Sequence, residues 1–201
     1  MTELREGFRF VRGDYTIQLL LLTVGMVSVF GFSLITLIPA WSTEILKGDV
    51  RTNGLLLSAR GAGAMIGALT LASLAGYKSR EKLWTAGIIT LPLSMILFSF
   101  VRIIPLSLLV LVVIGGSMIM LVNSSNALVQ HRLPDHLRGR VMGIYTMIFM
   151  GGQPLGSLSI GWLATAIGEP TALKIFATLL LVFAVWINLR HREIRSEPAI
   201  A

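Results

Sequence analysis

Two polar side chains lie deep inside long apolar runs, and they are the first candidates for a functional site. Arg60 lies in LLLSARGAGAMIG, and Gln153 lies in GGQPLGSLSIG. A charge in hydrocarbon is costly and usually faces a cavity or a partner, so Arg60 is a candidate anion contact. Its long side chain can equally extend back to the nearer membrane surface, because only about 9 Å of helix separates it from that end of its run.

Gln153 lies roughly 18 Å along its own run, near the middle of a membrane, where transporters place binding sites and bends. A structural bend with a buried glutamine is the competing interpretation. Ser117, Asn123 and Asn126 complete the candidate substrate cavity. The two asparagines share one helical face with Gln130 and can line a vestibule or hydrogen-bond to a neighbouring helix.

Small residues recur around these polar groups. Gly63 and Gly67 are four residues apart, a spacing that lets another helix backbone approach closely. Gly152 and Gly156 form a second pair of this kind. Between them, Pro154 removes a backbone donor, so we expect a bend there. Helix packing is a more frequent reason for such a stripe than substrate contact.

A short basic segment, HRLPDHLRGR, precedes the run that contains Gln153. We expect a loop here, and its candidate functional residues are Pro134, Asp135, Arg138, Gly139 and Arg140.

Several kinds of chemistry are missing from the sequence. The chain has no cysteine, and its three histidines, His131, His136 and His191, all lie outside the apolar runs. No HExxH pair, serine-protease motif or phosphate-binding glycine loop is present. We therefore expect no metal, no cofactor and no enzymatic activity.

The composition indicates an integral membrane protein. The 201 residues are 54% hydrophobic and 13% charged, and the mean hydropathy is +0.79. A soluble domain averages about 25% charged residues. The net charge of +7 does not indicate nucleic-acid binding, because the basic residues form small clusters between apolar runs.

The positions of these runs predict an all-α protein with six transmembrane helices in a domain over residues 15–190. The expected spans are 17–40, 55–75, 83–101, 103–128, 141–167 and 172–189. Basic residues strongly favour one side, with 12 there and 4 on the other. Both termini are therefore expected in the cytoplasm. Residues 1–14 form either a helix on the cytoplasmic membrane surface or a linker end, and residues 191–201 form a cytoplasmic tail.

The chain resembles the C-terminal half of a major facilitator superfamily transporter, especially bacterial efflux proteins of the enterobactin-exporter type. The resemblance covers nearly the whole length. It is carried by ELREGFRFVR, FGFSLITLIPAW, GLLLSARGAGAMIGALTLASL and LPDHLRGRVMGIYTMIFMGGQPLGSLSIGWLA. One departure is AGYKSREKL, which lacks the aspartate of the family's usual loop motif between its second and third helices.

The resemblance implies efflux of a small molecule by alternating access, in a bacterial inner membrane. It implies that the first, second, fourth and fifth spans line the cavity, and that the basic segment with Arg138 and Arg140 controls a cytosolic gate. A superfamily member normally has two six-helix halves, so we expect a second half as partner: a separate chain, a missing N-terminal half, or a parallel copy. The alternative is a truncated fragment or a membrane packing partner that transports nothing.

Overall fold

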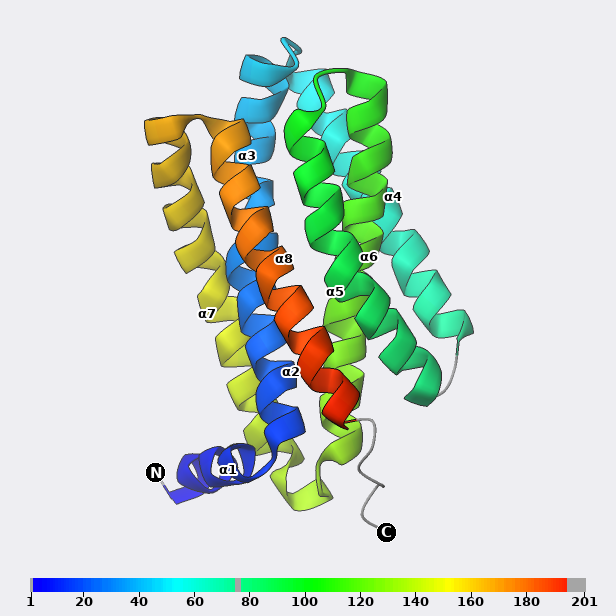
Figure 1. Cartoon of the computed structure of the whole chain (residues 1–201), viewed down its shortest axis with the longest axis vertical. Coiled ribbons are helices and arrows are strands. Elements are labelled where there is room, and N and C mark those ends of the chain that lie inside the picture. Colours follow the sequence, from blue (N-terminus) through cyan, green and yellow to red (C-terminus); the bar gives the residue numbers. More distant parts are fainter. Residues whose placement is uncertain (1, 75–76, 195–201) are drawn as a thin grey trace.

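The computed structural model describes residues 2–74 and 77–194, and the elements in these residues are helices (Figure 1). In chain order they are α1 (Thr2–Gly13), α2 (Tyr15–Met26), the π-helical η1 (Val27–Gly31), α3 (Leu34–Ala40), the π-helical η2 (Trp41–Ile45), α4 (Val50–Ser73), α5 (Tyr77–Phe100), α6 (Ile104–Arg132), α7 (Asp135–Ile167) and α8 (Glu169–Ile194).

Five helical segments in the described residues are long and apolar enough to cross a membrane. They are Tyr15–Ile45, Val50–Ser73, Ser79–Phe100, Ile104–Arg132 and Glu169–Arg190. The remaining long helix, α7, has 33 residues and no charged side chain after Arg140. Its mean hydropathy is lower than that of the five segments, because Gly151, Gly152, Gln153 and Pro154 interrupt its middle. The chain is thus a multi-pass membrane protein, and a sixth crossing stays a prediction.

Several helices extend past the predicted spans. α4 begins at Val50, because two hydrogen bonds close its start. The Asp49 carboxylate accepts a 3.0 Å bond from the Thr52 amide, and the Thr52 hydroxyl oxygen accepts one from the Asp49 amide. These bonds form an N-terminal capping box. The Thr52 backbone hydrogen bond also lowers the pKa of the Asp49 carboxyl. The predicted end of this span, residue 75, lies outside the described residues.

The first span is one long helical path with two π-helical segments. It was predicted to end at Ala40, but η2 continues it to Ile45. Trp41 is fully buried there and stacks on Phe98 of α5, with ring centroids 4.7 Å apart. Lys47, with φ of 53°, lies in the left-handed region and ends the path.

The long helices run side by side, and α1 lies across one end of them (Figure 1). The α6–α7 connection and the last turns of α8 are at that same end. The predicted basic segments therefore gather at one end of the bundle. α8 continues to Ile194, so the predicted tail begins inside this helix, and residues 195–201 lie outside the described part of the chain.

Candidate functional site

Arg60 points into the bundle. α4 begins five residues earlier than predicted, which places Arg60 about 15 Å along the helix rather than 9 Å. Its backbone carbonyl lies level with Gly115 of α6, while its Nη2 reaches the sulfur of Met118 at 3.4 Å. Met118 is one turn further from the α6 start, and helical side chains lean back toward that start. The contact therefore places the guanidinium against α6, and cavity contact and snorkelling both stay predictions.

The surroundings of Arg60 are aromatic and sulfur-containing. Its guanidinium carbon lies 6.0 Å from the centroid of the Phe32 ring. Within the described residues, Nε is buried and has no hydrogen-bond partner, and no carboxylate forms an ion pair with this arginine. The site therefore holds a cation whose contacts are a thioether and an aromatic face.

An aromatic row continues from Phe32 into α7. Phe32 meets Phe149 edge to face, with centroids 5.1 Å apart and planes at 86°. Phe149 stacks on Tyr145 with centroids 6.5 Å apart and planes at 27°. The Tyr145 hydroxyl donates to the Val122 carbonyl of α6 at 3.0 Å. We call Arg60, Met118, Phe32, Phe149 and Tyr145 the central cluster. Its members come from the first span, α4, α6 and α7, the four spans that the family resemblance assigns to the cavity.

Gln153 lies on the same face of α7 as this cluster. Phe149, Gln153 and Ser157 follow one another at four-residue spacing. Phe149 contacts Phe32, and the Ser157 hydroxyl accepts a 2.9 Å hydrogen bond from Thr36, one turn further along the first span. The half-buried Gln153 therefore lies between two contacts that join α7 to the first span.

The other predicted cavity residues are placed differently. Ser117 is buried and donates to the Val113 carbonyl, and its own carbonyl faces Gly87 of α5. Asn123 is exposed. Asn126 accepts a hydrogen bond from Gln130 and lies beside the Tyr145 hydroxyl, so it extends the central cluster toward the end that carries α1. Ser117 and Asn123 do not join the cluster.

Two glycine pairs hold the four spans close together. A Cβ at Gly63 would lie 1.9 Å from the Val112 carbonyl oxygen, and one at Gly67 would lie 2.6 Å from the Gly116 oxygen. These approaches fix α4 against α6 beside Arg60.

The second pair holds the first span against α7. A Cβ at Gly156 would lie 2.0 Å from the Val29 oxygen, and one at Gly152 would lie 2.7 Å from Ser28 Oγ. Ser28 Oγ also donates to the Phe149 carbonyl at 2.5 Å. The α7 helix is continuous through Pro154.

The predicted gate loop differs from the structure. Only Leu133 and Pro134 separate α6 from α7, because both have extended ψ angles that end one helix and start the next. Asp135, Arg138, Gly139 and Arg140 lie in the first two turns of α7 instead. Charged side chains do not interrupt a helix beyond the membrane, so the polar segment was misread as a loop.

The contacts of this α7 start are with itself and with α1. Arg138 pairs with Asp135 at 2.9 Å, one turn away on the helix. Arg140 pairs with Glu6 of α1. A Cβ at Gly7 would lie 3.3 Å from Arg140 Cβ, so α1 rests directly on α7. The predicted gate arginine thus holds α1 against α7.

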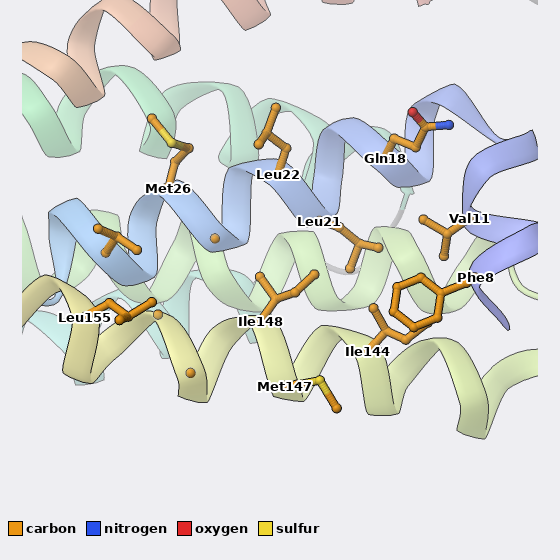
Figure 2. A pocket seen from close by; sticks show the side chains of 14 residues that line it. Phe8, Val11, Gln18, Leu21, Leu22, Met26, Ile144, Met147, Ile148 and Leu155 are labelled. Carbon is orange, nitrogen blue, oxygen red and sulfur yellow. The ribbon is translucent and has the colours of Figure 1, made fainter. Parts of the chain in front are cut away.

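An apolar groove of about 670 Å³ runs between α2 and α7 (Figure 2). Phe8 and Val11 of α1 lie at one end of it, beside Ile144 and Leu21. Among the described residues that line it, Gln18 has the one polar side chain. None of the predicted polar cavity residues lines this groove.

Sequence reasoning missed Phe32, Phe149, Tyr145 and Met118 of the central cluster. An aromatic or methionine residue in an apolar run looks the same whether it faces lipid, the core or a ligand. The four-residue spacing of Tyr145, Phe149 and Gln153 was the signal available, because it places two aromatic rings on the face of the polar residue.

Comparisons with known proteins find a family match and several relatives. The family model described as transmembrane secretion effector matches residues 1–200. The chain is similar to the multidrug efflux pump Tap of Mycolicibacterium fortuitum, with 31% identity over 96% of this chain and 48% of the pump. It is 29% identical to Tap of Mycobacterium tuberculosis (strain ATCC 25618 / H37Rv) over 81% of this chain and 39% of that pump. The chain spans half or less of the length of these relatives.

Proposed function

Because the chain belongs to the transmembrane secretion effector family of the major facilitator superfamily, we propose that it exports small molecules across a membrane by alternating access. The predicted family resemblance is confirmed, and membership of a transporter family agrees with the expectation that the chain is not an enzyme. The observation that carries the proposal is the central cluster. Side chains from four separate spans meet there around a half-buried cation, as a binding site between helices requires.

The proposed topology is six crossings with both termini in the cytoplasm of a bacterial cell, across its inner membrane. The charge bias of 12 against 4 supports it. So does the gathering of α1, the α6–α7 connection and the last turns of α8 at one end of the bundle. In this arrangement α7 is the fifth crossing, and its Gly152 and Gly156 face the first span.

The proposed partner is a second six-helix half. The chain spans half or less of the length of the relatives it matches, and both named relatives are multidrug efflux pumps. The exposed apolar side chains Met147, Met150, Leu155, Leu158 and Trp162 of α7 give a helix face on which such a half can pack. A parallel second copy of this chain is the other arrangement, because the superfamily's halves are related by an axis along the membrane normal.

The proposed cytosolic gate is the contact of α1 with α7. The Glu6–Arg140 pair and the close approach at Gly7 hold α1 over the end of the apolar groove. Movement of α1 away from α7 would open that end. Arg138 is directed to Asp135 and stabilises the helix start.

The test is uptake of the neutral fluorescent probe N-phenyl-1-naphthylamine into everted membrane vesicles. Vesicles carry this chain alone, this chain with a co-expressed six-span half, or neither. Energy-dependent uptake that requires this chain supports export. Equal uptake in all three preparations would contradict it and favour a membrane packing partner without transport. Uptake only when the second half is co-expressed would indicate a split transporter. Uptake by this chain alone would indicate a parallel homodimer.

A further inference from the structure

Arg60 is a cation in the membrane interior whose hydrogen-bonding capacity is largely unused. A guanidinium offers five N–H donors, and a thioether sulfur is a weak acceptor. Among the described residues, the partners of Arg60 are the Met118 sulfur and the Phe32 ring, while the buried Nε has none. A buried charge without hydrogen-bonded partners is strongly unfavourable, so this arrangement is better suited to a state in which an acceptor is present.

The position of Arg60 restricts what that acceptor can be. Arg60 lies five residues, about 8 Å, beyond Leu55, where the apolar part of α4 begins, and so inside the hydrocarbon region and not among the headgroup phosphates. The apolar runs of the sequence contain no Asp or Glu that could approach it from within the chain. The neighbouring face of α4 is open, because a Cβ at Gly61 would meet nothing within 4 Å.

The surroundings also restrict the rest of the ligand. Phe32 lies beside the guanidinium of Arg60. Phe149 and Phe32 meet edge to face, with ring centroids 5.1 Å apart. Both rings are half-buried and therefore partly accessible. Aromatic side chains favour planar aromatic ligands through offset or edge contacts. A fixed positive charge beside them disfavours cationic ligands, because the like charges repel in a low-dielectric site.

We propose that the central cluster recognises an aromatic anion, with Arg60 binding its carboxylate or sulfonate and Phe32 and Phe149 contacting its rings. This inference rests on the proposed export function and specifies its substrate class. A planar guanidinium can bind such a group with two parallel charge-assisted hydrogen bonds. The anion supplies the acceptor for Nε that the described residues do not.

The experiment uses two probes with one aromatic framework. 8-Anilinonaphthalene-1-sulfonate carries a sulfonate, and N-phenyl-1-naphthylamine does not. Binding of each is measured by fluorescence to the 201-residue chain in zwitterionic lipid nanodiscs, with empty nanodiscs subtracted. Wild-type protein is expected to bind the sulfonate at least tenfold more tightly. Arg60→Gln is expected to remove that preference, with less than a twofold change for the neutral probe.

Arg102→Gln is the matched control. Arg102 also lies over an aromatic ring, that of Trp41 at 5.7 Å, but its Nη1 already donates to the Ser99 and Val101 carbonyls at 2.9 Å. The control is expected to keep the sulfonate preference. Arg60→Lys keeps the charge without the planar fork, and is expected to retain part of it.

Two results would overturn the proposal: no sulfonate preference in the wild type, or an unchanged preference in folded Arg60→Gln. The wild-type comparison decides the matter even if Arg60→Gln does not fold. Transport is a separate readout. Sulfonate-selective binding without vesicle uptake would contradict export and support the recognition site. Uptake of the neutral probe without sulfonate preference would support export and contradict the recognition site.

Discussion

Gly63→Ala is the sharpest test of how α4 is placed against α6. The added Cβ would lie 1.9 Å from the Val112 carbonyl oxygen, and real Cβ atoms are essentially never closer than 3.0 Å to such an atom. The obstructing atom belongs to the backbone and cannot rotate away. The two helices must therefore separate locally by about 1 Å, which is overpacking of a kind that costs roughly 1–3 kcal/mol.

The net loss is smaller than this clash. Alanine stabilises a helix interior by up to about 1 kcal/mol relative to glycine. We therefore expect Gly63→Ala to lower the free energy of unfolding by about 1–2 kcal/mol. The melting temperature should fall by roughly 2–8 °C in a protein of this size. Unfolding by SDS titration and thermal melting in mild detergent, both followed by tryptophan fluorescence, give these two quantities.

Gly61→Ala is the matched control on the same helix. A Cβ there would have nothing within 4 Å, so only the gain in helix propensity acts and stability should stay equal or rise. If Gly63→Ala were as stable as Gly61→Ala, the close approach of α4 and α6 would not exist in the protein. If both lowered stability equally, the effect would belong to glycine in α4 and not to this contact.

Three further changes are expected to act locally, each checked by thermal melting. Tyr145→Phe removes the 3.0 Å hydrogen bond to the Val122 carbonyl and should cost about 1 kcal/mol. The hydrogen bond from the Thr52 amide lowers the pKa of the Asp49 carboxyl below its ordinary 3.8. The ionised carboxylate therefore stabilises the fold above that pH, and this stabilisation is lost as the pH falls through the pKa of Asp49 in the folded protein. Asp49→Asn should weaken the dependence of melting temperature on pH between about 6 and about 3. Lys47→Gly should raise stability by about 1 kcal/mol, because glycine adopts the observed φ of 53° without the steric cost of a side chain; no gain would contradict the left-handed conformation.

The sequence predicts features that depend on one helix at a time. The four-residue spacing of Gly63 and Gly67 predicts a close approach, and the structure places Val112 and Gly116 of α6 there. The depth of Arg60 follows from counting residues along an apolar run, subject to where α4 begins.

Features that depend on two helices could not be predicted in this way. The partner of Arg60 is Phe32, 28 positions earlier in the sequence, and nothing in an apolar run distinguishes that ring from one facing lipid. Ser117 was assigned to the cavity, but its direction is set by how α6 packs on α5 through Gly87. Asp135–Arg140 were read as a loop because hydropathy detects the edge of the membrane and not the end of a helix.

The π-helical segment η1 ends at Gly31, directly before Phe32. A π turn accommodates one residue more than an α turn, so it acts as a single-residue insertion absorbed without breaking the helix. An extra residue in a regular α-helix would turn everything that follows by about 100°, and the wider π turn takes up that residue instead. η1 therefore keeps Phe32 facing Arg60 and Thr36 facing Ser157. Deleting one residue from Val27–Gly31 should restore a regular α-helix and keep both contacts, whereas inserting one more should rotate the outer half of the first span away from Arg60 and Ser157.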